Sequence, residues 1–249
     1  MSKKDCALAA LVLQASAVAL ATDPPKPDGQ WRGSLGAGLS ITQSTTDSIS
    51  VNFTGDAVRA TEADQWNFAG AVLYGRSEDA DGVSTTSANL ARGAGRYAYN
   101  VDPRWYGFGS LELDYDQLQD IDLRAVAGLG AGYHVTKTDE AVFDLIGGLA
   151  YNHTQYVGET VDATELLLGE ESNHKLTSGT TLEQRLAVYP NLTDSGQYRV
   201  QFAAGLATRL SETFDLTVTL TDNYQSNPQP GISRNELLFI TGISVRFGE

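Results

Sequence analysis

The chain has 249 residues and a formal net charge of −14, with 41% hydrophobic and 19% charged residues. This length suits one domain, or at most two small ones, and the acidic balance argues against a protein that binds nucleic-acid phosphates. After residues 1–21 no segment approaches the ~18 uninterrupted apolar residues of a membrane-spanning helix, which excludes a helical membrane protein.

Residues 1–21 have the features of a cleaved signal peptide. Lys3 and Lys4 form a basic start, an apolar stretch runs over 6–20, and Ala-Leu-Ala at 19–21 offers the small residues that a signal peptidase requires. A buried N-terminal helix is the alternative, but it would end in these same small residues. The single cysteine, Cys6, would leave with the leader, so no thiol chemistry is expected in the mature chain.

The segment that follows, TDPPKPDGQ at 22–30, predicts an extended linker. Pro24, Pro25 and Pro27 have no backbone N–H to donate and hold the chain away from helix. Regular structure is therefore expected from Trp31, as one barrel domain over 31–249.

From Trp31 onward, apolar and polar residues alternate as they do in half-buried β-strands. In 198–210 the even positions are Tyr, Val, Phe, Ala, Leu, Thr and Leu, and the odd ones are Arg, Gln, Ala, Gly, Ala and Arg. The segment 214–223 alternates in the same way, with Phe, Leu, Val and Leu on one face. No window with helical spacing competes with this pattern.

Short polar turns separate about twelve such segments, which predicts antiparallel hairpins in succession. The predicted strands begin near Trp31, Ser48, Gln65, Ser84, Arg104, Asp120, Ala141, Asp162, Thr180, Gln197, Phe214 and Arg234. The weakest prediction covers 162–173, where TELLLGEES alternates poorly.

The composition of the polar face indicates which solvent the apolar face meets. Gly128, Gly130 and Gly132 share one face, and the polar face of 199–209 consists mainly of alanine, glycine and arginine. Strands that face water in a soluble protein seldom use so many small residues. Aromatic residues also gather near strand ends, as in the girdles of membrane barrels. We therefore predict an all-β fold, a closed antiparallel up-and-down transmembrane barrel.

Three segments carry a resemblance to a known family: WYGFGSLELDYDQLQDIDLRAVAGLGAGYHV at 105–135, YPNLTDSGQYRVQF at 189–202, and YQSNPQPGISRNELLFITGISVRF at 224–247. The chain resembles the bacterial family of salt-induced outer-membrane proteins, whose function is unknown. The likeness runs from about Trp31 to Phe247 and implies a barrel in the outer membrane of a Gram-negative bacterium, with a link to salt or osmotic stress. It brings no catalytic residues. Barrels of this membrane commonly end on an aromatic residue, whereas Gly248 and Glu249 follow Phe247 here.

The candidate site is a ladder of charged residues predicted to face the lumen on three neighbouring strands. Its members are Glu112, Asp114, Asp116, Asp122, Arg124, Arg92 and Arg96. The simpler interpretation is that cross-strand ion pairs stiffen the barrel. The alternative is a constriction that attracts cations in a narrow pore.

Other motifs give weaker signals. The glycines at 128–132 lie inside an alternating strand, so they indicate room for larger side chains opposite rather than a dinucleotide loop. His134, His153 and His174 lack metal-ligand spacing, and we expect neither metal nor cofactor. The nearest fragment of a hydrolase site, 152–154, has no serine on its face. We expect no enzyme.

The sequence thus predicts a monomeric outer-membrane barrel with a narrow, mixed-charge lumen, structural or weakly conductive. Its expected partners are membrane lipid, lipopolysaccharide and the outer-membrane assembly machinery, and not nucleic acid. Two alternatives stay open: a lipid-modifying outer-membrane enzyme, which needs a lipid-facing Ser/His pair, and an exported soluble barrel, whose Leu, Phe and Tyr side chains would line a ligand cavity.

Overall fold

A computed structural model describes residues 26–42, 47–79, 81–230 and 232–248. The predicted signal peptide and the first part of the linker, 22–25, lie outside these ranges. Among the described residues, no helix is long and apolar enough to cross a bilayer.

The described residues form twelve β-strands and one short 3₁₀-helix. The strands are β1 (Trp31–Thr42), β2 (Asp47–Ala60), β3 (Asp64–Glu78), β4 (Ser84–Asn100), β5 (Trp105–Asp116), β6 (Ile121–Lys137), β7 (Ala141–Tyr156), β8 (Glu159–Thr177), β9 (Thr180–Pro190), β10 (Tyr198–Arg209), β11 (Phe214–Gln225) and β12 (Asn235–Phe247), with η1 (Gln117–Gln119) between β5 and β6. Each strand pairs antiparallel with its neighbours in sequence, and β1 pairs with β12 to close the barrel. The predicted fold class is confirmed.

The observed strands start within about three residues of the predicted positions. The segment that looked weakest belongs to β8, which is the longest strand at 19 residues. Its poor alternation has a physical cause, because Leu167 is buried inside the barrel while Leu166 and Leu168 lie on the opposite, outer face. Apolar side chains therefore occupy both faces of β8.

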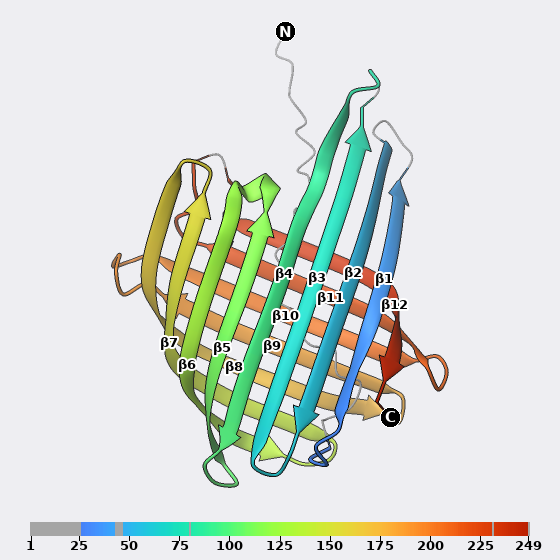
Figure 1. Cartoon of the computed structure of the whole chain (residues 1–249), viewed down its shortest axis with the longest axis vertical. Coiled ribbons are helices and arrows are strands. Elements are labelled where there is room, and N and C mark those ends of the chain that lie inside the picture. Colours follow the sequence, from blue (N-terminus) through green and yellow to red (C-terminus); the bar gives the residue numbers. More distant parts are fainter. Residues whose placement is uncertain (1–25, 43–46, 80, 231, 249) are drawn as a thin grey trace.

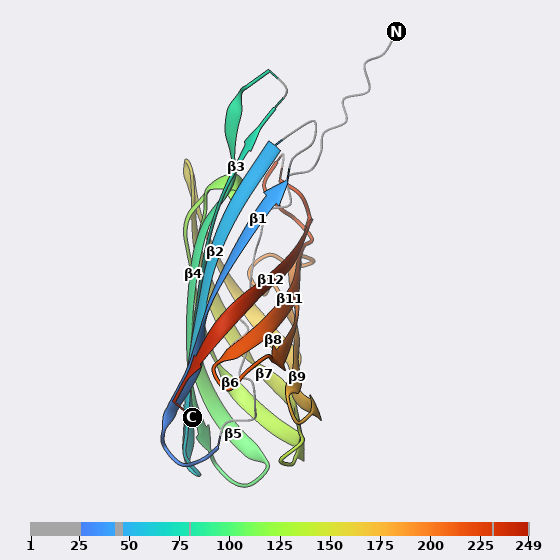
Figure 2. The same ribbon diagram turned by 90° about the vertical axis from the view of Figure 1, so that its right-hand side faces the viewer.

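The barrel is flattened: it is wide in Figure 1, where β1–β7 lie in front of β8–β12, and narrow in Figure 2. β1 starts and β12 ends at the lower end in Figure 1. The lower connections are short, and the longest ones, 191–197 and 226–234, lie at the upper end. Flattening brings the two walls close enough for side chains to reach across.

The outer and inner faces have opposite character. Large apolar side chains such as Leu35, Phe53, Leu129 and Phe239 are more than half exposed on the outside. About half of the buried residues that the structure describes are polar or charged, namely Ser34, Asp56, Arg92, Asp116, Gln119, Arg124, Asp144, Asn152, Thr154, Glu165, Ser172, Thr181, Glu183, Asp215, Thr221, Asn223, Ser244 and Arg246. A soluble barrel would bury its apolar face instead. This inversion is the arrangement of a membrane barrel, with an apolar wall around a polar interior.

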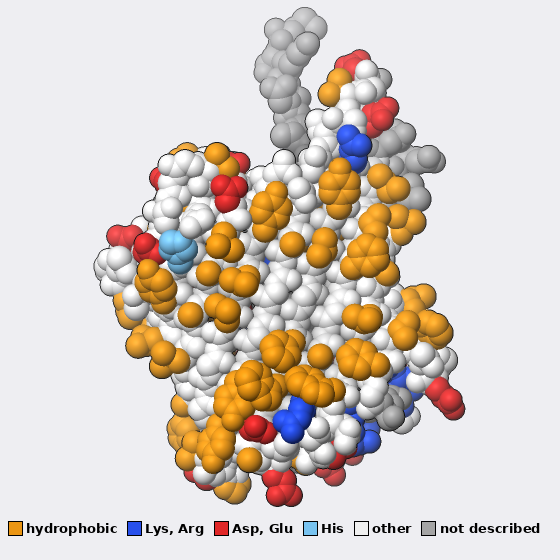
Figure 3. Space-filling view, viewed as in Figure 1, with side chains coloured by type: hydrophobic (Ala, Val, Ile, Leu, Met, Phe, Trp, Pro, Cys, Tyr) orange, Lys and Arg blue, Asp and Glu red, His pale blue; other side chains and the backbone are white. Residues whose placement is uncertain are grey.

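The space-filling view shows the same arrangement from one side (Figure 3). Hydrophobic side chains spread over the middle of the wall, and charged side chains gather towards the two ends. Near the lower end aromatic rings contact one another: Trp66 with Tyr97 at 4.6 Å between ring centroids, and Trp105 with Tyr133 at 4.9 Å. At the upper end Tyr198 contacts Tyr224 at 5.7 Å. These rings lie where the girdles of a membrane barrel are expected.

The glycines of β6 make room for large side chains of β5, as the sequence predicts. Gly132 pairs with Tyr106 and Gly130 with Phe108. A Cβ atom on Gly132 would lie 2.1 Å from the Tyr106 ring, and one on Gly130 would lie 2.8 Å from the Phe108 ring. Both aromatic rings are buried inside the barrel. The glycine stripe therefore lets them lie flat against the inner wall.

Carboxylates order the chain at the lower end. Asp28 pairs with Arg32 just before and within β1, which lowers the pKa of Asp28. In the β4–β5 turn, the backbone N–H groups of Arg104 and Trp105 donate to Oδ1 of Asp102 at 2.7 and 2.9 Å, and these bonds lower the pKa of Asp102. Both carboxylates are thus held in their charged form at neutral pH.

Candidate functional site

The lumen contains a cavity of about 1000 Å³. Side chains from β2–β11 line it, and they mix charged groups, amides and aromatic rings. Beside this cavity an apolar cluster fills part of the interior, made of Tyr106, Phe108, Val126, Ile146, Ala150, Leu167, Ala187 and Tyr189. The lumen is therefore partly packed like a protein core and partly open.

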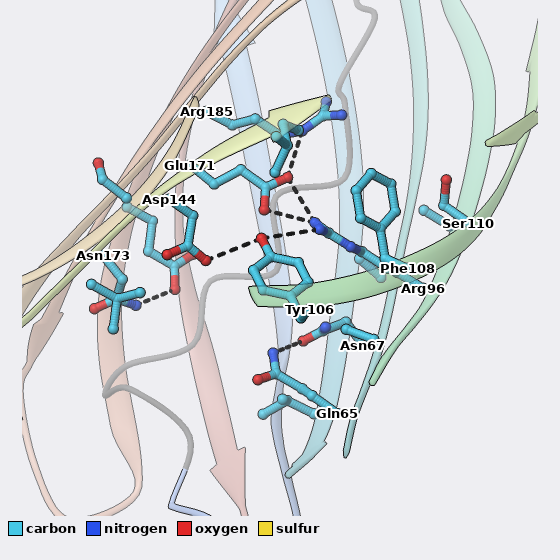
Figure 4. Close-up of a pocket in the computed structure, with 18 of the residues that line it drawn as sticks. Gln65, Asn67, Arg96, Tyr106, Phe108, Ser110, Asp144, Glu171, Asn173 and Arg185 are labelled. Atoms are coloured by element: carbon cyan, nitrogen blue, oxygen red, sulfur yellow. Dashed lines mark hydrogen bonds and ion pairs between the residues drawn. The ribbon is translucent and has the colours of Figure 1, made fainter. Parts of the chain in front are cut away.

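A charged bridge crosses the lumen between opposite walls. The Nη1 atom of Arg96 on β4 lies 2.8 and 2.6 Å from the two carboxylate oxygens of Glu171 on β8. The same carboxylate accepts from Nε of Arg185 on β9 at 3.2 Å. Three strands, β5–β7, lie between β4 and β8 around the ring, so this bridge joins the two flattened walls (Figure 4).

Aromatic rings position the arginines of this bridge. The Arg96 guanidinium lies 4.1 Å from the centroid of the Phe108 ring, and its Nη2 lies 3.5 Å from the hydroxyl of Tyr106. Nη2 of Arg185 donates to the Tyr189 hydroxyl at 2.9 Å. A guanidinium held over an aromatic face and by hydrogen bonds has few alternative positions.

A second ion pair lies nearer the upper end. Arg199 on β10 donates to both carboxylate oxygens of Glu165 on β8, at 2.9 and 2.5 Å. The Arg199 guanidinium also lies 4.6 Å from the centroid of the Tyr189 ring. Because Tyr189 also accepts from Arg185, this ring links the upper pair to the cross-lumen bridge.

A third group holds the β5–β7 wall. The Tyr106 hydroxyl donates to Oδ2 of Asp144 at 3.1 Å, and Nδ1 of His134 lies 2.7 Å from Oδ1 of the same carboxylate. His134 therefore has a structural partner inside the lumen. Among the described residues, no group of three or more His, Cys, Asp or Glu side chains could hold a metal ion.

The predicted ladder is found in part. Arg92 pairs in register with Asp114, with Nε 3.1 Å from Oδ1, and its Nη2 lies 4.0 Å from Oδ2 of the fully buried Asp116. Arg124 is buried in the same wall, where its Nε donates to the hydroxyl of Thr154 at 3.2 Å. Glu112 lines the cavity and makes no direct ion pair with a described residue.

Two positions of the ladder differ from the prediction. Asp122 was predicted to face the lumen with Arg124, but it is exposed, because the register between β6 and β7 shifts between Ile121 and Leu123 and turns Asp122 outward. Arg96 was predicted to pair with acids of the neighbouring strand; it faces Ser110 there and reaches Glu171 instead.

Sequence reasoning missed the partners on the far wall. Glu165, Glu171, Arg185 and Arg199 all lie on the inward face of β8–β10. At least for Arg199, the alternation of polar and apolar residues shows that the side chain faces inward. No sequence signal shows which charged residues meet across a lumen, because that depends on how far the barrel is flattened.

Over residues 35–247 the chain matches the model of the family described as protein of unknown function, DUF481. The chain belongs to this family. The description names no activity, so the link to salt stress stays a prediction. No curated protein matches the chain.

Among solved structures, two porins and an outer membrane channel illustrate the similarity. The NanC porin shares 11% identity at a TM-score of 0.46, with 86% of this chain and 96% of that one covered. The KdgM porin, in complex with disordered oligogalacturonate, shares 9% at 0.45, with coverages of 87% and 99%. An outer membrane channel from Pseudomonas putida F1 shares 13% at 0.43, with coverages of 90% and 96%. The strand pairing of this chain itself establishes the closed barrel.

Proposed function

We propose that this protein is an integral outer-membrane barrel whose lumen is held nearly closed by ion pairs, so that it acts as a structural barrel or passes only small ions. The observation that carries the proposal is the Arg96–Glu171 bridge across a partly filled interior. The apolar outer wall supports the membrane location. That wall also argues against the soluble ligand-binding alternative, since Leu129, Leu149 and Phe239 face outward.

We also infer from the sequence how the chain is exported, assembled and surrounded by lipid. The chain is exported through a cleaved signal peptide, inserted as a monomer by the outer-membrane assembly machinery, and surrounded by lipid and lipopolysaccharide. Its use under salt or osmotic stress belongs to the proposal as well. A deletion strain that grows like its parent in high salt would contradict this role in salt stress.

Orientation follows from the connections. Periplasmic termini and short periplasmic turns are usual in these barrels, so the short lower connections support a periplasmic location for the lower end in Figure 1. A tag inserted at Gly82, in the upper β3–β4 connection, should be labelled on intact cells, and one at Asp139, in the lower β6–β7 turn, should not. Labelling at Asp139 alone would show the inverted orientation.

Conductance measurements in a planar bilayer test whether the lumen is nearly closed. We expect small conductance steps that favour cations, because the Glu112 carboxylate faces the cavity without a direct ion-pair partner. Replacing Glu112 by Gln and Asp114 by Asn should reduce the cation preference while the barrel stays folded. Large steps that admit sugars would contradict a nearly closed lumen. The absence of any conductance would contradict the passage of small ions and support a purely structural barrel.

A further inference from the structure

A polar cluster interrupts the apolar outer wall near the upper end of β7 and β8. Tyr151, His153 and Gln155 alternate on β7 with the buried, inward-facing Asn152 and Thr154, so all three project outward. In the space-filling view a histidine lies beside acidic side chains near β7, above the hydrophobic middle of the wall (Figure 3). Ionisable groups on a lipid-facing surface are costly, and they are functional candidates by default.

Hydrogen bonds fix this cluster around one carboxylate. Asp162 on β8 pairs in register with His153, whose Nδ1 lies 2.7 Å from Asp162 Oδ1. The Tyr151 hydroxyl donates to the same oxygen at 2.8 Å. Nε2 of Gln155 lies 3.2 Å from Nε2 of His153. Both contacts to Asp162 use Oδ1, which leaves Oδ2 as an acceptor on a side chain that is 52% exposed.

The wall beside the cluster carries small and apolar side chains along which an acyl chain can lie. On β6, Ala125 pairs with His153 and Ala127 with Tyr151, so small side chains flank the two larger ones. Leu129 and Leu149 are exposed further down the same wall. A chain lying in this strip would place its polar headgroup at the carboxylate.

The free groups of the cluster determine which headgroup fits. Asp162 offers a charged acceptor, which repels phosphate and attracts a positively charged donor. The half-exposed Tyr151 ring beside it can contact a cation through its face. A primary ammonium satisfies both, because it carries charge and N–H donors. A quaternary ammonium can use the ring but cannot donate to Oδ2.

We propose that Tyr151, His153, Gln155 and Asp162 form a binding site for the primary ammonium headgroup of a membrane lipid. His153 and Tyr151 orient the Asp162 carboxylate, and the alanine strip of β6 receives the acyl chain. Such an ammonium occurs on ethanolamine phospholipids and on glycolipids that carry an amino sugar. Both share the chemistry that the site recognises.

Native mass spectrometry of the full-length folded protein tests the site. The probes are phosphatidylethanolamine, phosphatidylcholine with identical acyl chains, and a glycolipid with a free amino sugar. We expect wild type to retain the ethanolamine lipid about two- to fivefold more than the choline lipid, the size of one exposed ion pair, because both headgroups can contact the Tyr151 ring and only the primary ammonium donates to Asp162. Asp162→Asn should abolish the difference. Asp194→Asn removes an equal charge from an upper loop outside the site and should leave the difference intact.

Each result separates the alternatives. Stronger binding of the ethanolamine lipid, the amino-sugar glycolipid or both supports the site and identifies the source of the ammonium. Equal retention of all three lipids by wild type overturns the proposal, as does a preference that survives in Asp162→Asn. The heat-dependent gel shift of each variant shows that its barrel is closed, so loss of folding cannot be mistaken for loss of binding.

Discussion

Val218→Arg will prevent stable insertion of the barrel. Val218 lies midway along β11, between the outward-facing Leu216 and Leu220, and it pairs with Leu206 of β10 on the same outer face. An arginine there would enter the hydrocarbon core, at about 2–4 kcal/mol near the bilayer midplane. The fraction of folded protein recovered after refolding into lipid vesicles measures the effect.

Thr217→Arg is the matched control, one residue away on the opposite face. Thr217 faces the lumen, where its hydroxyl donates to the carbonyl of Gly242 at 3.2 Å. An arginine in a polar interior keeps access to water and to carboxylates, so the loss should be much smaller. If both variants insert equally well, the outer wall does not face lipid.

Glu171→Gln will destabilise the barrel. Its carboxylate holds Arg96 from one wall and Arg185 from the other. Removing the charge leaves two arginines without their anion in a restricted space, and breaking a buried pair costs about 3–5 kcal/mol. The urea midpoint of unfolding in lipid vesicles should fall accordingly.

Glu170→Gln supplies the neighbouring control for this variant. Glu170 lies on the outer face of β8 and accepts from Nε2 of Gln184 at 2.8 Å. Neutralising an outward carboxylate should leave stability unchanged or raise it, because no inward arginine depends on it.

The Glu171→Gln variant should also conduct more than wild type, since the bridge no longer ties the walls together. Unchanged stability and conductance in Glu171→Gln would show that the bridge has no structural role.

The fold could be predicted from sequence because the alternation of residue types within each strand shows which side chains share a face. Residues 198–210 alternate cleanly, and the glycines of β6 point to large partners on β5, which are Tyr106 and Phe108. These are local signals with a period of two residues. The strand starts followed from them, even for β8, where the apolar Leu167 inside the lumen blurs the pattern.

The site could be predicted only where its partners are neighbours in sequence order. Arg92 and Asp114 lie on adjacent strands, so parity brings them together. Asp122 was misplaced because a β-bulge shifts the parity within β6, and a single extra residue leaves no mark in the composition. Arg96 meets Glu171 across the lumen at a separation of 75 residues, which depends on the flattened cross-section of the closed barrel.

Migration of the membrane-bound protein with and without boiling tests the central claim most directly. A closed barrel with an apolar outer wall resists detergent until it is heated, so the protein should fractionate with the outer membrane and run faster unboiled than boiled. Protein found in the soluble fraction, with the same mobility before and after boiling, would contradict the account.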